Sequence, residues 1–163
     1  MAFLQIDYKS EALMRGVNIK VILPSDGMAG KWEPPYKTLY LLPGYSATAT
    51  ELITYLGLRG QSELKGIAIV LPDGENLFYQ DLSDRMTFYS TYVGKELVEV
   101  TRKMLPLSTK REDTFIGGIS MGGYGALYNG FKYRDTFSKV VAFSPASDAY
   151  MLLAEEDAPG FSR

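Results

Sequence analysis

Apolar and polar residues are arranged along the chain in a pattern that predicts a sheet flanked by helices. Residues 3–9 and 17–23 are two strand candidates, and the second alternates apolar with polar positions. Such alternation is typical of a strand with one buried face, as at the antiparallel edge of a sheet. Four later segments are runs of mainly apolar residues, which predict strands covered on both faces: residues 38–42, 66–71, 114–118 and 139–143.

Helical patterns lie between these strands. We expect helices at about residues 50–58, 89–104 and 121–133. The second of them repeats large apolar side chains at spacings of three and four, which places them on one face: Tyr89, Val93, Leu97, Val100 and Met104. Strands therefore alternate with helices from residue 38 onward. This order predicts an α/β fold, a three-layer sandwich in which a mostly parallel central sheet has helices on both faces.

Composition narrows the classes of function. The chain has 163 residues, 46% of them apolar, with 17 basic and 19 acidic side chains and a net charge of -2. These values fit one globular domain and argue against disorder and against a nucleic-acid partner. The N-terminus has no secretory pattern, and no apolar run reaches the length of a membrane span, so we expect no membrane association and, by default, a cytoplasmic location.

Two residue types are missing, because the sequence contains no Cys and no His. Without Cys there is no disulfide, thiol nucleophile or iron–sulfur cluster. Without His there is no imidazole base, no His metal ligand and no Ser-His-Asp triad within these residues. We therefore expect neither a metal nor a cofactor.

The strongest chemical motif surrounds Ser120. In a parallel sheet, sites form beyond the carboxyl ends of the strands, and Gly118, Ser120 and Gly122 make a G-x-S-x-G element between a predicted strand and a predicted helix. In that context the motif predicts a nucleophile elbow, with the backbone N–H of Met121 facing the oxygen that becomes negative during attack. The alternative is a glycine-rich turn that only lets a helix pack closely on a sheet. The glycine spacing does not match a dinucleotide-binding loop.

Five blocks in register resemble one branch of the α/β-hydrolases. They are LLPGYS at 41–46, VLPDG at 70–74, FYQD at 78–81, YV with EL at 92–97, and IGGISMGGYGAL at 116–127. Together, across about residues 16–146, the chain resembles the esterase D, S-formylglutathione hydrolase and bacterial tributyrin esterase group. The resemblance implies a serine carboxylesterase that cleaves short-chain esters or small thioesters through an acyl-enzyme on Ser120.

The resemblance also implies roles for particular residues. Met121 and Tyr45 would supply the two N–H groups of an oxyanion hole. The family commonly has His where this chain has Pro43, but the functional group is the N–H that follows. Tyr45, Phe78 and Tyr79 could form an apolar wall for a small acyl or alcohol group, although each ring, taken alone, fits ordinary packing better.

Three polar side chains have simpler expected roles. Asp81 is expected to be a carboxylate that stabilises a loop or caps a helix. The Lys side chains nearest downstream of Ser120, Lys132 and Lys139, read as ordinary surface residues.

The catalytic triad is not complete in these residues. In the family an acid and then a His follow the Ser, each after a later strand. Here Asp148 is the most interesting acid, although a loop or helix-cap role fits it better, and no His follows. We therefore expect a single α/β-hydrolase domain, residues 1–163, that ends before its last strands and is catalytically incomplete.

Two other functions stay open at this stage. A noncatalytic relic could keep the elbow as architecture and act as a binding domain. An acyltransferase could use the same fold with a sugar or lipid hydroxyl in place of water. The strand at 139–143 would form an exposed sheet edge, so we also expect self-association through that edge.

Overall fold

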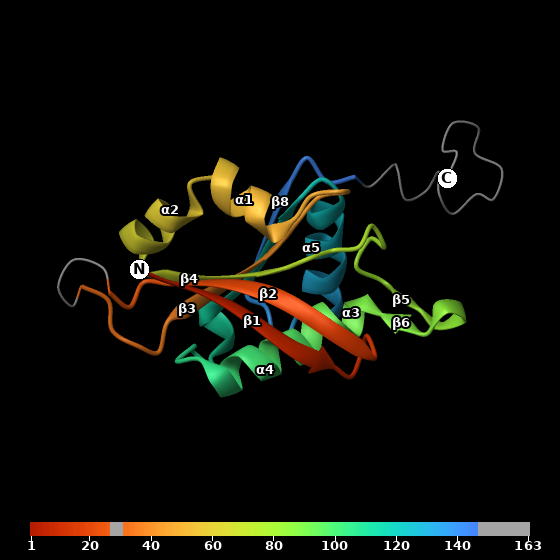
Figure 1. Ribbon diagram of the computed structural model, residues 1–163, viewed down its shortest axis with the longest axis horizontal. Coiled ribbons are helices and arrows are strands. Elements are labelled where there is room, and N and C mark those ends of the chain that lie inside the picture. The colour runs from red at the N-terminus through yellow and green to blue at the C-terminus, as the bar shows by residue number, and fades with distance from the viewer. Residues whose placement is uncertain (27–30, 147–163) are drawn as a thin grey trace.

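A computed structural model describes residues 1–26 and 31–146, which form a six-stranded sheet with helices on both faces (Figure 1). The strand order is β1-β2-β4-β3-β7-β8. The strands are β1 (Ala2–Ser10), β2 (Arg15–Leu23), β3 (Lys37–Leu42), β4 (Ile67–Pro72), β7 (Thr114–Ile119) and β8 (Lys139–Phe143). β2 pairs antiparallel with β1 and β4, whereas β4, β3, β7 and β8 run parallel. The predicted antiparallel edge and mostly parallel sheet are confirmed.

The helices form the two outer layers. They are α1 (Ala49–Tyr55), α2 (Leu58–Lys65), α3 (Tyr89–Thr91), α4 (Leu97–Met104) and α5 (Met121–Lys132). A π-helical turn, Tyr92–Glu96, joins α3 to α4, and a small hairpin consists of β5 (Asp81–Leu82) and β6 (Thr87–Phe88). Helices α1 and α2 cover one face of the sheet, and α3, α4 and α5 cover the other (Figure 1).

Each face of the sheet has its own apolar core, because neighbouring side chains of a strand point in opposite directions. In β3, Tyr40 and Leu42 belong to the larger core, which α3, α4 and α5 cover. Leu41, between them, belongs to the smaller core with Leu52 of α1 and Leu58 of α2. The central strands are thus buried on both faces, as their apolar runs predicted, whereas β8, for which the same was expected, lies at the sheet edge and has no buried residue.

Two predicted helices differ from the structure. The helix expected at residues 50–58 ends at Tyr55, and a second helix, α2, which was not predicted, begins at Leu58 after a turn at Gly57, which has a φ of 58°. The helix expected at residues 89–104 contains the π-helical turn, and the extra residue in that turn shifts the buried face by one position. As a result Thr101 is buried, whereas Met104 is 51% exposed.

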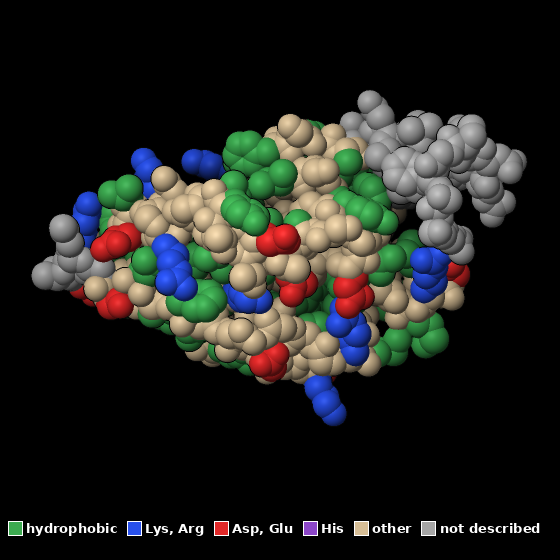
Figure 2. Space-filling view, turned by 45° about the horizontal axis from the view of Figure 1, so that its top comes forward, with side chains coloured by type: hydrophobic (Ala, Val, Ile, Leu, Met, Phe, Trp, Pro, Cys, Tyr) green, Lys and Arg blue, Asp and Glu red, His purple; other side chains and the backbone are tan. Residues whose placement is uncertain are grey.

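The surface carries charges of both signs. On the face seen in Figure 2, Lys and Arg side chains lie interspersed with Asp and Glu side chains. Across residues 1–26 and 31–146, no helix has the length and apolar character needed to cross a membrane.

Candidate active site

Ser120 lies at the turn where β7 ends and α5 begins. Its backbone has a φ of 55° and a ψ of -118°, a conformation that costs free energy for any residue other than glycine and that persists only where surrounding contacts impose it. The Ser120 N–H donates to the Phe143 carbonyl at 2.9 Å, and its carbonyl accepts from the N–H groups of Tyr124 at 3.0 Å and Ala146 at 3.1 Å. Contacts from β8 and α5 therefore fix the half-buried Ser120.

The two motif glycines allow a close approach between α5 and the sheet. A Cβ on Gly122 would lie 2.5 Å from the Pro43 oxygen and 2.6 Å from the Leu42 carbonyl carbon. A Cβ on Gly118 would overlap the backbone carbonyl of Gly122. The spacing G-x-S-x-G is therefore required by the packing of the turn, whatever chemistry Ser120 performs.

The loop at residues 43–46, which follows β3, passes directly beside Ser120. A Cβ on Gly44 would be 3.4 Å from the Ser120 Cβ, so the backbone of the loop touches the side of the elbow. Within residues 1–26 and 31–146, the backbone N–H groups of Tyr45 and Met121 donate to no protein acceptor. Met121 is the first residue of α5, where the helix dipole also favours negative charge.

The aromatic residues predicted near the site have different surroundings. Tyr45 is 56% exposed, and its ring centroid lies 6.5 Å from that of the buried Phe78. Tyr79 is 0% exposed, so its ring offers no surface to a small molecule in this structure. Its hydroxyl donates to the Pro43 carbonyl at 2.8 Å. Burial raises the pKa of Tyr79 well above its usual value, so this hydroxyl keeps its proton and stays a donor.

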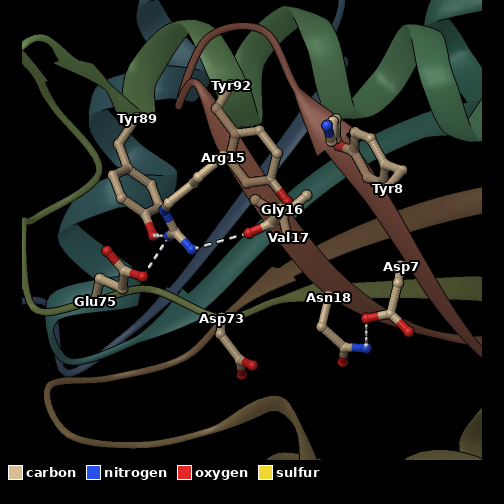
Figure 3. A pocket seen from close by; sticks show the side chains of 11 residues that line it. Asp7, Tyr8, Arg15, Gly16, Val17, Asn18, Asp73, Glu75, Tyr89 and Tyr92 are labelled. Carbon is tan, nitrogen blue, oxygen red and sulfur yellow. Dashed lines mark hydrogen bonds and ion pairs between the residues drawn. The ribbon is translucent and has the colours of Figure 1, made fainter.

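Two cavities lie on different sides of this region. One, of about 320 Å³, is bounded by the exposed side of the loop, by α1 and by Ile119, the residue before Ser120. The larger, of about 540 Å³, lies between the β1–β2 hairpin, the loop after β4 and the tyrosines of α3 and the π-helical turn (Figure 3). In its wall, Arg15 forms an ion pair with Glu75 and donates to the Tyr89 hydroxyl at 2.9 Å. The larger cavity is therefore not the one beside Ser120.

Asp81 stabilises the loop that it ends, as expected. It accepts from the Thr91 N–H at 2.9 Å and from the Lys132 ammonium at 3.0 Å. Burial alone would raise the pKa of Asp81, but the hydrogen bonds from Thr91 and Lys132 outweigh it and lower that pKa. Lys132 lies on the surface, as expected, with its side chain 38% exposed, and it also donates to Ser90 at 2.8 Å.

The structure leaves several parts of a triad unplaced. Asp148 lies outside the described residues, and the sequence contains no His. Among residues 1–26 and 31–146, no cluster of three or more acidic side chains is arranged to hold a metal ion.

Sequence reasoning missed two asparagines, one that contacts the loop and one that contacts Tyr79. Asn76 accepts from the Ser46 N–H at 2.6 Å, and Asn129 donates to the Tyr79 carbonyl at 3.1 Å. Neither residue belongs to a recognisable motif, although Asn is one of the few side chains that tolerates a positive φ, which Asn76 has.

Comparison with known proteins identifies relatives over most of the chain. The model of the family described as putative esterase matches residues 10–159. An acetyl esterase of Caldicellulosiruptor saccharolyticus is 40% identical over 151 residues, which are 90% of this chain and 57% of that protein. An S-formylglutathione hydrolase of Paracoccus denitrificans is 29% identical and is covered over 55% of its length. The chain thus spans a little more than half the length of these curated relatives.

Solved structures agree with this assignment. The fluorophosphonate-binding serine hydrolase F of Staphylococcus aureus, in a substrate-bound structure, superposes with a TM-score of 0.83 at 29% identity, over 97% of this chain and 62% of that one. The S-formylglutathione hydrolase of the same organism gives 0.80 at 30% identity, over 95% and 61%. These neighbours confirm the α/β-hydrolase fold.

Proposed function

Since this chain belongs to the putative esterase family, we propose that it carries the nucleophile and oxyanion hole of a serine carboxylesterase acting on short-chain esters or small thioesters. Ser120 Oγ attacks the ester carbonyl carbon, and the resulting oxyanion is held by the N–H groups of Met121 and Tyr45. Collapse of this intermediate releases the alcohol or thiol and leaves an acyl-Ser120, which water then hydrolyses.

One observation carries this proposal above all. Ser120 occupies a strained backbone conformation at the turn between β7 and α5, beside two backbone N–H groups that have no protein acceptor within the described part of the chain. Backbone strain of this kind clusters at functional sites. A turn with a purely architectural role would not need a hydroxyl-bearing side chain at its strained position.

These 163 residues contain no imidazole that could act as the general base. A serine hydroxyl is a weak nucleophile until a base takes its proton. We therefore propose that the chain alone is catalytically incomplete, with only the roughly 10³–10⁴-fold acceleration that binding and an oxyanion hole provide.

The test is covalent labelling with a fluorophosphonate probe, with and without added imidazole as an external base. We expect slow labelling of the chain on Ser120, faster labelling when imidazole is present, and none in Ser120→Ala. Ser83, an exposed serine in the turn between β5 and β6, provides the control, because Ser83→Ala should label like the unmodified chain. Labelling that survives Ser120→Ala would overturn the proposal.

The absence of His gives one competing function specific support. A noncatalytic domain that keeps the elbow as architecture would need no base. It predicts that imidazole does not accelerate the labelling of Ser120. It also predicts that, with imidazole present, the chain hydrolyses p-nitrophenyl acetate no faster than Ser120→Ala does. Self-association through the edge of β8 stays a separate prediction.

A further inference from the structure

The segment at residues 75–79, which connects β4 to β5, contains an unusual concentration of backbone strain. Four of its five residues have a positive φ although none is glycine: Glu75 at 48°, Asn76 at 56°, Phe78 at 53° and Tyr79 at 56°. Each such conformation is unfavourable for an L-residue with a side chain. A run of them persists only where the surrounding contacts impose it, and such runs call for a functional explanation.

The strained segment makes two hydrogen bonds with the loop at residues 43–46. The Tyr79 hydroxyl donates to the Pro43 carbonyl at 2.8 Å, and the Asn76 side-chain oxygen accepts from the Ser46 N–H at 2.6 Å. These two hydrogen bonds hold the backbone on either side of Tyr45. The orientation of the peptide that carries the Tyr45 N–H is therefore set between two fixed points.

Tyr79 is itself held rigidly against α5, the helix that begins directly after Ser120. A Cβ on Gly125, in α5, would lie 2.8 Å from the Tyr79 Cγ, and a Cβ on Gly74 would lie 2.8 Å from its Cζ. Asn129, one helical turn further along α5, donates to the Tyr79 carbonyl at 3.1 Å. Two glycines and an amide thus form a slot for this one side chain.

The other end of the segment is tied to the β1–β2 hairpin. Glu75 forms its ion pair with Arg15, and Arg15 in turn donates to the Tyr89 hydroxyl, in the wall of the larger cavity (Figure 3). The segment is therefore anchored at both ends to elements other than the loop that it contacts.

We infer that Tyr79 and Asn76 are positioning residues that set the geometry of the 43–46 loop relative to Ser120. The inference rests on the proposed function, because it concerns the second N–H of the oxyanion hole. Neither residue acts on the substrate directly: Tyr79 is fully buried, and both act through backbone groups of the loop.

The matched test for Tyr79 compares two variants that each remove one buried hydroxyl. Tyr79→Phe removes the hydrogen bond to Pro43, and Tyr40→Phe removes the one between Tyr40 and Thr101, at 2.9 Å, in another part of the same core. Both side chains are 0% exposed, and each variant removes only the hydroxyl oxygen from a buried ring. We expect the maximal rate of fluorophosphonate labelling of Ser120 to fall about 10-fold in Tyr79→Phe only, with the half-saturating probe concentration unchanged.

The matched test for Asn76 separates the acceptor from the backbone conformation. Asn76→Gly keeps the positive φ and removes the acceptor, whereas Asn76→Asp keeps both. We expect labelling to slow in the Gly variant and to recover in the Asp variant. Amide hydrogen exchange of Ser46, followed by NMR, should accelerate in Asn76→Gly and stay protected in Asn76→Asp.

The outcomes separate this inference from the proposed function. If Tyr79→Phe labels as fast as Tyr40→Phe, the positioning role is wrong even though Ser120 is the nucleophile. If labelling does not depend on Ser120, the proposed function fails, and hydrogen exchange alone decides the inference. In that case unchanged exchange at Tyr45 and Ser46 in both Tyr79→Phe and Asn76→Gly would overturn it.

Discussion

Replacing Gly122 by alanine tests the packing of the elbow most directly. The added Cβ would overlap the Leu42 carbonyl oxygen, and it would lie 2.5 Å from the Pro43 oxygen, which is about 0.9 Å short of ordinary contact at 3.4 Å. Strand β3 cannot retreat, because it is paired with β4 on one side and β7 on the other. The start of α5 must therefore move, and Ser120 with it.

The size of the effect follows from that displacement. Overpacking of a well-packed region costs typically about 1–3 kcal/mol. In a chain of this length a loss of about 2 kcal/mol lowers Tm by roughly 4–8 °C. A displacement approaching 1 Å at the nucleophile is expected to slow the labelling of Ser120 by about 10²-fold.

The assay compares Gly122→Ala with Gly60→Ala by thermal unfolding and by labelling. Gly122 is the second residue of α5 and Gly60 the third residue of α2, but a Cβ on Gly60 meets nothing within 4 Å. Gly60→Ala should therefore gain up to about 1 kcal/mol from helix propensity and label normally. Equal Tm values for the two variants would refute the close approach of α5 to β3.

Three further predictions concern stability. Because hydrogen bonds from Thr91 and Lys132 lower the pKa of Asp81, its stabilising effect is fully present above the unfolded pKa of about 4; the difference in unfolding free energy between the wild type and Asp81→Asn, measured in urea, should begin to shrink near that pH and disappear as the pH falls through the lowered pKa of the folded state. Thr48 caps α1 through a capping box, so Thr48→Ala should lower the unfolding free energy by about 1 kcal/mol, whereas Thr48→Ser should stay close to the wild type. Burial raises the pKa of Tyr40 to about 12, so stability should fall as the pH rises from about 10 towards that value, and by less in Tyr40→Phe.

The parts of the structure that sequence could predict are those encoded by local pattern. The apolar run of β3 and the G-x-S-x-G turn at Ser120 each follow from neighbouring residues. Strands β5 and β6 have only two residues each, too few to show any periodicity. The start of α2 directly after Gly57 was likewise not predicted from the sequence, because only one exposed turn separates α2 from α1.

The supports of the candidate site depend on contacts between distant residues, which a single sequence does not reveal. The hydrogen bond from Tyr79 to Pro43 spans 36 positions, and the contact of Lys132 with Asp81 spans 51. Tyr79 could be recognised as an aromatic residue near the site, but only the fold shows that it is buried and that its hydroxyl points to the loop.

The π-helical turn Tyr92–Glu96 has a consequence for insertions and deletions. Its wider hydrogen-bonding ring accommodates about one residue more than an α-helical turn, and Gly94 within it leaves the space that the ring of Tyr133 fills. Removing one residue from most helices rotates everything beyond the deletion by about 100°. Here the same deletion would close the wide turn into an ordinary one and leave α3 and α4 in their present orientation. The deletion would instead change the packing of Tyr133, just beyond the end of α5, because its ring fills the space beside Gly94.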